Sequence, residues 1–284
     1  MRKDKKQSFE FLDKIPTLNN ASAFIFWEDD ISPINSIFFP LSIYAEMRPY
    51  VKFNTKSYYP SEGLKLQGTI LKKQESVLWV SDKKNTIFFI GNKPIFKHSE
   101  FIDTLIDILV MSGVTNVYTV SCISAQTSHR QKRAPLIIFN SEELKTNFSQ
   151  KYKSIKYKPF SITPNMKTDI PEFNFYISWK CAEKKIPSIN LMIETPFYMS
   201  LIGDVSASIT AGKLICKILK WRFQFKKSLT QIAEEQNELI EFLVKNSEDA
   251  MDFIERIEEN ELLSMEEMQL LLSEFKRVME EKRP

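Results

Sequence analysis

The residues best suited to chemistry are three basic side chains in a polar stretch that follows an apolar run. His129, Arg130 and Arg133 lie a few residues beyond the run 116–123. If that run is a parallel strand, the polar stretch lies at the carboxyl edge of a sheet, where α/β proteins bind ligands. In such a cleft His129 would act as a general base, and Arg130 or Arg133 would hold an anion. The alternative is a solvated basic loop without a catalytic role.

Glu194 is a fourth candidate for this cleft, because it ends the apolar run 188–194 at what would be a second carboxyl edge. Its carboxylate could face the basic stretch, or it could cap the segment that begins after Pro196. No second carboxylate or nucleophile follows at a recognisable spacing. The sequence also lacks a nucleophile elbow, a Walker motif, a dinucleotide-binding motif and a zinc-protease motif. An enzyme therefore receives little support from the sequence.

Composition limits the other kinds of site. The 284 residues include only six glycines and two histidines, which disfavours glycine-rich phosphate loops and histidine-rich metal sites. Cys122, Cys181 and Cys216 are widely spaced and predict buried thiols rather than disulfides or a zinc site. Lysines around Tyr152 and Tyr157 resemble a nucleic-acid stripe, but a pI of about 8.5 favours a solvated loop. We expect no cofactor, no metal and no nucleic-acid partner.

The elements that must position these residues alternate between apolar runs and amphipathic stretches. Strands are expected at 21–27, 50–54, 76–80, 86–90, 116–123, 136–139 and 188–194, and helices at 33–48, 100–112, 141–150, 174–185 and 204–221. The runs 76–80 and 86–90 predict a hairpin, and 86–123 predicts a β-α-β unit with parallel strands. The pattern predicts an α/β fold: a three-layer α/β/α arrangement with a mostly parallel central sheet.

Local residues mark some of the helix ends. Asn174 is predicted to cap the helix that follows it. Gly113 is predicted to stop the helix before it. Near the C-terminus, Ser228 with Gln231 and Ser264 with Glu267 fit the capping box of a helix start. Three C-terminal helices are therefore expected, at about 229–245, 248–259 and 265–281.

Charge separates a basic body from an acidic C-terminal part. Residues 228–284 contain 16 acidic and 6 basic residues, a net charge of −10, which leaves 20 acidic and 33 basic residues, net +13, in 1–227. We expect an N-terminal extension (1–20), an α/β core domain (21–227) and an acidic helical segment (228–284). The last helix has an apolar seam that must face the body, another helix or a second subunit. The seam consists of Met265, Met268, Leu272, Phe275 and Met279.

The sequence predicts neither export nor a membrane span. No apolar run reaches the roughly 18–20 residues that cross a bilayer. Residues 1–20 lack the apolar stretch and cleavage site of a secretory signal. We expect a cytoplasmic protein with no membrane partner.

Three stretches, in this order, resemble the proteasome assembly chaperone 2-like family of archaea and actinobacteria. Residues 101–135 (FIDTLIDILVMSGVTNVYTVSCISAQTSHRQKRAP) are similar to that family's helix, Gly-Val turn, strand and loop. Residues 186–201 (IPSINLMIETPFYMSL) are similar to its strand, proline and aromatic-Tyr element. Residues 233–261 are similar to its acidic helical end. The resemblance covers approximately residues 21–261.

The resemblance implies a nucleoside-phosphorylase-like fold without catalysis. It further implies a homo-oligomer that acts as a chaperone or adaptor for proteasome core-particle subunits, including those of α type. Two departures are visible: the stretch 162–173 has no glycine, and Lys282-Arg283-Pro284 lacks the hydrophobic-Tyr-any ending of some proteasome-binding proteins. The alternative function is a nucleoside phosphorylase or hydrolase-like enzyme acting through His129, Arg133 and Glu194.

Overall fold

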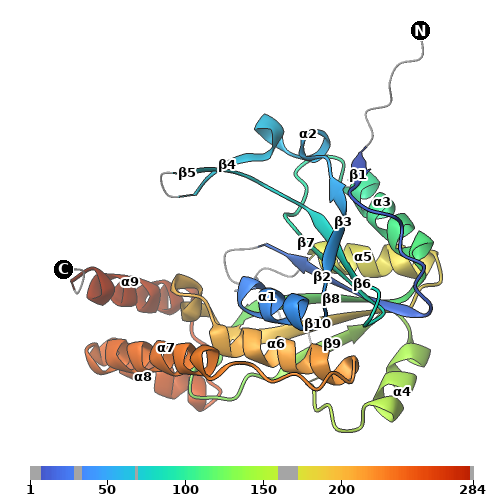
Figure 1. Ribbon diagram of the computed structural model, residues 1–284. Helices are drawn as coiled ribbons and strands as arrows, with labels where there is room; N and C mark the ends of the chain where they lie inside the picture. Colours follow the sequence, from blue (N-terminus) through green and yellow to red (C-terminus); the bar gives the residue numbers. More distant parts are fainter. Residues whose placement is uncertain (1–7, 29–33, 68–69, 159–171, 282–284) are drawn as a thin grey trace.

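A mixed β-sheet forms the centre of the molecule. The computed structural model describes residues 8–28, 34–67, 70–158 and 172–281. Eight strands pair in the order β1-β3-β6-β7-β2-β8-β10-β9, and two more form a separate ribbon, β4-β5 (Figure 1). The strands are β1 (Phe9–Phe11), β2 (Ala21–Trp27), β3 (Arg48–Phe53), β4 (Leu64–Gln67), β5 (Ile70–Lys73), β6 (Val77–Ser81), β7 (Thr86–Gly91), β8 (Val114–Ala125), β9 (Pro135–Phe139) and β10 (Ser188–Pro196).

Parallel pairing is confined to the middle of this sheet. The neighbours β7, β2, β8 and β10 run parallel. The outer strands β1, β3 and β6 on one side, and β9 on the other, join by antiparallel pairs. The expectation of a mostly parallel sheet therefore holds for the four central strands, whereas the sheet as a whole is mixed. The central strand β2 is buried at all but one of its positions, as a strand covered on both faces should be.

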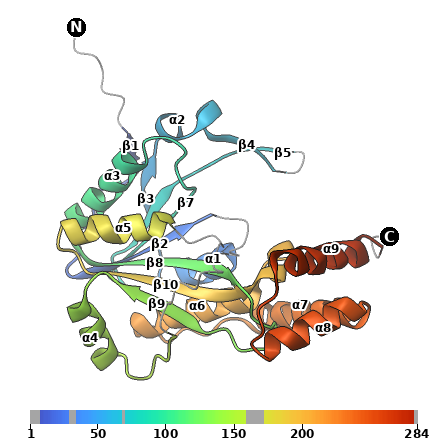
Figure 2. The same ribbon diagram turned by 180° about the vertical axis from the view of Figure 1, so that it is seen from behind.

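Helices cover both faces of the sheet, so the three-layer α/β/α fold predicted from the sequence is confirmed. Helices α3 and α5 lie on one face, and α1 and α6 lie on the other (Figures 1 and 2). The helices are α1 (Ile34–Tyr44), α2 (Thr55–Tyr58), α3 (His98–Met111), α4 (Glu142–Lys151), α5 (Glu172–Glu183), α6 (Val205–Ile218), α7 (Lys227–Lys245), α8 (Glu248–Glu258) and α9 (Met265–Glu281), with single turns η1 (Pro60–Gly63) and η2 (Phe197–Leu201). Within the described residues, no helix combines the length and apolar character needed to span a bilayer.

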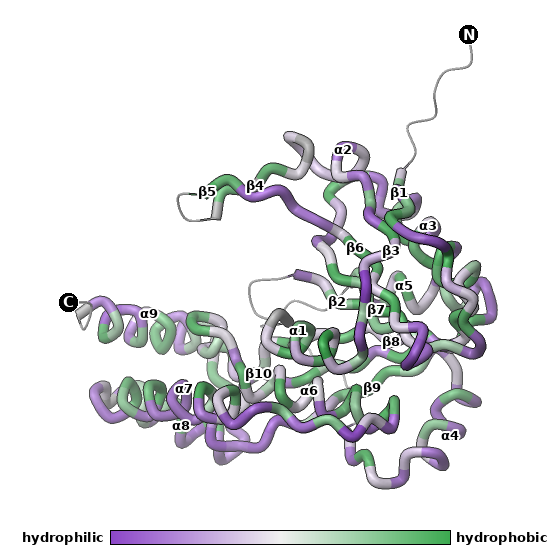
Figure 3. Tube along the Cα trace, viewed as in Figure 1, coloured by the Kyte–Doolittle hydropathy of each residue, from purple (hydrophilic) through white to green (hydrophobic). Residues whose placement is uncertain are grey.

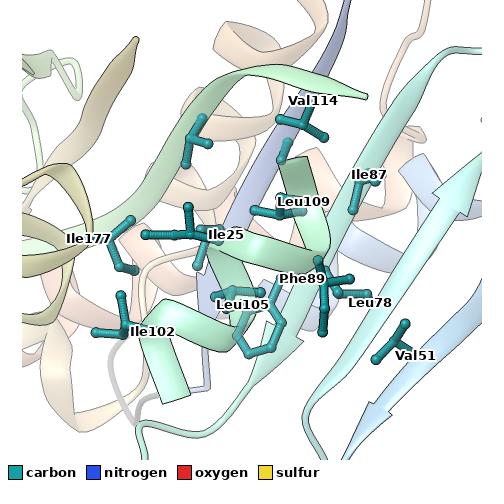
Figure 4. Packing of buried hydrophobic residues seen from close by; sticks show 14 of the residues in the cluster. Ile25, Val51, Leu78, Ile87, Phe89, Ile102, Leu105, Leu109, Val114 and Ile177 are labelled. Atoms are coloured by element: carbon teal, nitrogen blue, oxygen red, sulfur yellow. The ribbon is translucent and has the colours of Figure 1, made fainter. Parts of the chain in front are cut away.

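The packing of α3 on the sheet shows how the sequence specifies this architecture. Leu105 and Leu109 of α3 lie over Ile25 of β2 and Phe89 of β7, and all four are buried (Figure 4). The helix ends at the predicted stop, Gly113, whose φ of +82° is left-handed. A Cβ at that position would lie 2.1 Å from the Leu18 carbonyl oxygen, so the turn into β8 requires glycine.

The predicted supersecondary units are confirmed, with one addition. β6 and β7 form the expected antiparallel hairpin. β7, α3 and β8 form the expected β-α-β unit, but both strands pair with β2, which lies between them. A local pattern can therefore predict the crossover, whereas β2, the strand that lies between β7 and β8, comes from 64 residues before its partners in β7.

Two predicted helix caps are wrong and one is confirmed. Asn174 lies inside α5, and its Oδ1 accepts a hydrogen bond from Trp27 Nε1 at 2.9 Å, so it joins α5 to the sheet instead of capping the helix. Ser228 lies inside α7, which begins after Lys226 without a side-chain cap. The Ser264 box is present: Glu267 N donates to Ser264 Oγ at 3.2 Å, and Ser264 N donates to Glu267 Oε2 at 2.6 Å.

Two β elements lie where no structure is predicted from the sequence. β1 belongs to the N-terminal extension and adds an antiparallel edge strand beside β3. β4 and β5 form a two-stranded ribbon, here called the arm, that projects from the body (Figure 1). Both are short, and pairing with a partner strand, rather than a long apolar pattern, defines them.

The three predicted C-terminal helices are confirmed as α7, α8 and α9, and they project together from the body (Figures 1 and 2). Apolar and polar residues alternate along each of them with the helical repeat (Figure 3). Their apolar sides meet one another and η2 in a separate buried cluster that includes Tyr198, Ile240, Ile254 and Phe275. The C-terminal helices therefore have a small core of their own.

The predicted seam of α9 is largely used inside this cluster. Phe275 is fully buried there, and Met268, Leu272 and Met279 are partly buried against it. Met265 differs, because its side chain is 54% exposed. The seam could have faced the body, another helix or a second subunit. The structure shows it in contact with the neighbouring helices and the body.

Candidate functional site

The polar stretch that the sequence singled out is a loop at the carboxyl end of β8. This basic loop (residues 126–134) connects β8 to β9 and lies against the C-terminal helices. Ser128 Oγ donates to Glu258 Oε1 of α8 at 2.6 Å. Gln126 fastens the α8–α9 connection through both backbone groups of Leu263: Leu263 N donates to Oε1 at 2.6 Å, and Nε2 donates to the Leu263 carbonyl at 3.0 Å.

Arg130 binds the acidic helices through a bidentate ion pair. Its Nε donates to Glu241 Oε1 at 2.6 Å, and its Nη2 donates to Glu241 Oε2 at 3.0 Å. Nη1 reaches Glu258 Oε2 at 3.3 Å. The hydrogen bonds from Arg130 lower the pKa of Glu241 to about 2, and those from Glu241 raise the pKa of Arg130 above its ordinary value. Both groups therefore stay charged at neutral pH.

His129 is buried between the body and α7. Its Nε2 lies 3.0 Å from Glu241 Oε1, and its Nδ1 lies 3.0 Å from the Tyr198 hydroxyl oxygen. The His129 backbone N–H donates to the same hydroxyl at 2.8 Å. Burial lowers the pKa of His129, with Glu241 acting in the opposite direction, so the neutral ring is favoured. A neutral ring fits these contacts if Nε2–H donates to Glu241 and Nδ1 accepts from Tyr198.

Arg133 forms a second, more deeply buried ion pair. Its Nε donates to Asp204 Oδ2 at 2.6 Å, and the two side chains are only 3% and 0% exposed. Asp204 also caps α6, because its Oδ1 accepts from Ala207 N at 2.9 Å. Nη1 of Arg133 donates to the Gln131 carbonyl at 2.9 Å and also reaches the carbonyls of residues 128 and 129. Arg133 thus holds the loop in its fold and fixes it to the start of α6.

Glu194 lies apart from the other three predicted site residues. It forms an ion pair with Lys158, with Nζ and Oε2 separated by 2.7 Å. Neighbouring strand residues point to opposite faces, and Ile193 packs in the cluster that includes α6. Glu194 therefore points to the α5 side of the sheet. Among the described residues, no hydrogen bond or ion pair joins Glu194 to the basic loop.

This arrangement is suited to holding protein segments together rather than to bond chemistry. Both ring nitrogens of His129 have partners, and the charges of Arg130 and Arg133 are matched by carboxylates. The three cysteines are free thiols, with Cys181 and Cys216 buried as expected and Cys122 half-buried. In the part of the chain that the structure describes, no group of three or more His, Cys, Asp or Glu side chains could hold a metal ion.

Sequence reasoning missed the acidic side of this junction. Glu241, Glu258 and Asp204 were not singled out, and Tyr198 was noted only as part of an aromatic element. The available signal was global: a body with net charge +13 and a C-terminal part with net charge −10 were free to pair with each other. Charge totals cannot predict which of 16 carboxylates meets the loop, because that depends on how α7 and α8 dock.

Several proteins of known structure share this fold. A Mycobacterium tuberculosis protein of unknown function has a TM-score of 0.70 at 12% identity, over 89% of this chain and 90% of that one. A proteasome-assembly chaperone homologue, also from M. tuberculosis, has a TM-score of 0.64 at 13% identity, over 82% of this chain and 99% of that one. The archaeal proteasome activator PbaB of Pyrococcus furiosus has a TM-score of 0.62 at 13% identity, over 83% and 97%.

These structural likenesses, at such low identity, establish a shared fold. Comparison with curated protein sequences finds no match. The family comparison is more specific, because the model of the PAC2 family matches residues 41–244. That match spans most of the sheet, the whole basic loop and α7 as far as Glu241 and beyond, so both sides of the Arg130 ion pair lie inside it. The chain belongs to the PAC2 family.

Proposed function

We propose that this protein is a non-enzymatic, cytoplasmic, homo-oligomeric binding module that acts as a chaperone or adaptor for proteasome core-particle subunits. The observation that carries the proposal is the PAC2 family match over residues 41–244. Two proteins of the same fold, named as a proteasome-assembly chaperone homologue and a proteasome activator, support it further.

The geometry of the basic loop favours binding over the alternative of a nucleoside phosphorylase or hydrolase-like enzyme. That alternative requires a free general base and an anion-binding arginine in one cleft. Both ring nitrogens of His129 are instead hydrogen-bonded, one to Tyr198 and the other to Glu241. Arg133 is neutralised by Asp204, and Glu194 faces the other side of the sheet. Of these three residues, His129 contacts α7 through Glu241, Arg133 fixes the loop to the start of α6, and Glu194 pairs with Lys158.

For the partner surface, we propose the outer side of α9 and the turn before it. Leu262, Met265 and Leu270 are exposed there, next to the exposed carboxylates of Glu261 and Glu266. Apolar residues on an acidic background suit a partner with apolar and basic side chains. The inner seam of α9 is already covered, so among the predicted seam residues Met265 is the one best placed for this contact.

Native mass spectrometry of the purified chain, alone and mixed with α-type proteasome subunits of its source organism, tests the proposal. The expected result is a defined homo-oligomer that captures an α-type subunit. Met265→Ser combined with Leu270→Ser should reduce that capture. The matched control is Trp179→Ser, because Trp179 of α5 is equally exposed, at 54%, on a different part of the molecule. If no α-type subunit binds the wild-type chain, the proposed partner is wrong.

A ligand panel tests the enzyme alternative separately. Ligand present at about 100 times its dissociation constant would stabilise the protein by about 2.7 kcal/mol and raise its melting temperature. We expect no shift with nucleosides, with phosphate or with both together. A clear shift that His129→Gln or Arg133→Met abolishes, measured relative to each variant's own melting temperature, would favour the enzyme instead.

A further inference from the structure

The arm is an element that stands apart from the central sheet in the described structure. Among the strands that the structure describes, β4 and β5 pair only with each other, and the arm projects away from the sheet (Figures 1 and 2). All four of its apolar side chains are more than half exposed: Leu64, Leu66, Ile70 and Leu71. An isolated two-stranded ribbon is at best marginally stable in water, so such an arm gains stability from a surface that covers it.

The strand register collects most of these apolar side chains on one face. Leu66 lies directly opposite Leu71, and Leu64 lies opposite Lys73. Directly opposed residues share a face, as do residues two apart in a strand. Leu64, Leu66 and Leu71 therefore form one apolar face with Lys73 beside it, while Ile70 and Lys72 point to the other face. A leucine face of this kind fits another apolar surface.

The arm is also uniformly basic. Residues 64–73 contain three lysines and no aspartate or glutamate. Lys72 and Lys73 are exposed, and neither forms an ion pair with another described residue. The surface that covers the arm should accordingly combine apolar side chains with carboxylates.

The same chain carries such a surface on the outer side of α7. Ile232 and Leu239 are exposed seven residues apart, which places them on one face of the helix about 10 Å from each other. The exposed Glu235 is their neighbour on the helix surface, three residues after Ile232 and four before Leu239, and the exposed Glu238 follows it one turn later. The ion pairs found among the described residues do not include these glutamates, so their charges are available to a partner.

We propose that the arm of one copy lies on the outer face of α7 of a second copy, with its leucines against Ile232 and Leu239 and with Lys73, which shares the leucine face, beside Glu235. Arm and α7 lie well apart within one chain (Figures 1 and 2), so the contact is between copies. The contact can be reciprocal, with each arm on α7 of the other copy in a two-fold dimer, or head-to-tail, in which case repeating it gives a ring if the rotation closes. This inference rests on the self-association in the proposed function and assigns its surfaces.

Charge reversal on each side, and then on both, tests this contact by sedimentation velocity across a concentration series. Lys73→Glu should weaken self-association by about tenfold, because a carboxylate then faces Glu235. Glu235→Lys should do the same from the α7 side. The chain with both substitutions should regain self-association, because attraction is restored with the signs exchanged. Both side chains are exposed, so these variants should keep the wild-type melting temperature.

Two controls separate this inference from its alternatives. Lys153→Glu changes the net charge equally at an exposed lysine beyond α4 and should leave self-association unchanged. Leu66→Ser with Leu71→Ser should weaken it at high salt as well as at low salt, since apolar contact is not screened.

Each outcome decides a different part of the inference. A wild-type chain that remains monomeric overturns both the arm contact and the proposed self-association. An oligomer that ignores the arm reversal overturns the arm contact alone, and an arm reversal that the α7 reversal does not rescue overturns α7 as the acceptor. Capture of α-type proteasome subunits by the arm-reversed chain, measured alongside, shows whether partner binding survives independently of self-association.

Discussion

The C-terminal helices and the arm both project from the same α/β body, but they are held in place differently. The helices bury a cluster of their own, including Phe275 and Ile254, and the basic loop joins them to the body through ion pairs. The apolar side chains that the structure describes in the arm are all exposed, and its leucines face solvent. The C-terminal helices are therefore stabilised by contacts within the chain, whereas the arm has the exposed apolar residues of a binding surface.

The contrast shows that a segment is not identified as a binding element merely because it projects from the body. A projecting segment that is fixed by internal contacts contributes to folding stability, so damage to it should unfold part of the molecule. A segment without such contacts should tolerate the same damage in the monomer and show its loss only when copies or partners bind. Paired substitutions in the two regions can separate these behaviours.

The largest expected effect comes from truncating matched apolar side chains in the two regions. Phe275→Ala should lower the free energy of unfolding by about 3–5 kcal/mol, because it removes a fully buried ring from the helical cluster. Leu66→Ala in the arm should change it by no more than about 0.5 kcal/mol, because Leu66 is 64% exposed. Urea unfolding of both variants measures the difference. Equal losses would remove the distinction between the two projections.

The buried ion pair should come next. Arg133→Met leaves the carboxylate of Asp204 buried without its cation, which should cost about 3 kcal/mol, the low end for such a change because Asp204 keeps its cap bond to Ala207. Adding Asp204→Asn removes the unpaired charge while retaining a cap, so the double variant should recover part of the loss. Chemical denaturation of Arg133→Met, Asp204→Asn and the double variant completes a double-mutant cycle. If the stability losses of the two single variants simply add in the double variant, Arg133 and Asp204 are not coupled.

A smaller effect is expected from the outer ion pair. Arg130→Gln removes the bidentate contact to Glu241, but Arg130 is 39% exposed, so screening by solvent limits the loss to about 1 kcal/mol. Hydrogen exchange should report faster opening of α7 while the sheet keeps its protection. The matched control is Arg277→Gln, whose ion pair with Glu274 lies within α9. Unchanged exchange in α7 would mean that Arg130 does not hold the helices.

The smallest expected effect is a dependence on pH. The pKa of His129 is lowered in the folded protein by burial, so the unfolded chain takes up a proton first as the pH falls below about 6.5. His129 therefore contributes stability that is present above that pH and lost below it. The pKa of Glu241, lowered to about 2, acts in the same direction from about pH 4.5 downward.

The measurement compares unfolding of the wild type and His129→Gln at pH 7.5 and pH 5. Groups shared by both chains cancel in the difference, which isolates His129. We expect the advantage of the wild type over His129→Gln to shrink at pH 5. A wild-type advantage that grows on acidification would mean that the folded protein prefers the protonated ring.

The fold was largely predictable because its main elements carry complete local patterns. The run 21–27 is apolar throughout and forms β2 with the same bounds, and the three C-terminal helices start and end within a few residues of their predicted positions. Gly113 was identified as a helix stop from its residue type alone. Apolar periodicity and glycine are local signals, so no knowledge of distant residues was needed.

The missed elements and residues all depend on distant partners. β1 is defined by its pairing with β3, and the arm by pairing of two four-residue strands. The residue type of Asn174 predicts a helix cap, yet its partner is Trp27, 147 residues away in the sequence. The sequence pattern places Glu194 with the basic loop, but strand alternation turns it toward Lys158. Residue type states what a side chain can do, and its neighbours decide what it does.

The sequence by itself determined the alternation of strands and helices, the separation of a basic body from an acidic C-terminal part, and the PAC2 family to which the chain belongs. The tertiary structure decided that the basic loop binds Glu241, Glu258 and Asp204 and that the arm remains uncovered. The physical reason is range: hydrophobic periodicity and composition act along neighbouring residues, whereas an ion pair or a covered surface requires two distant segments to meet in one geometry.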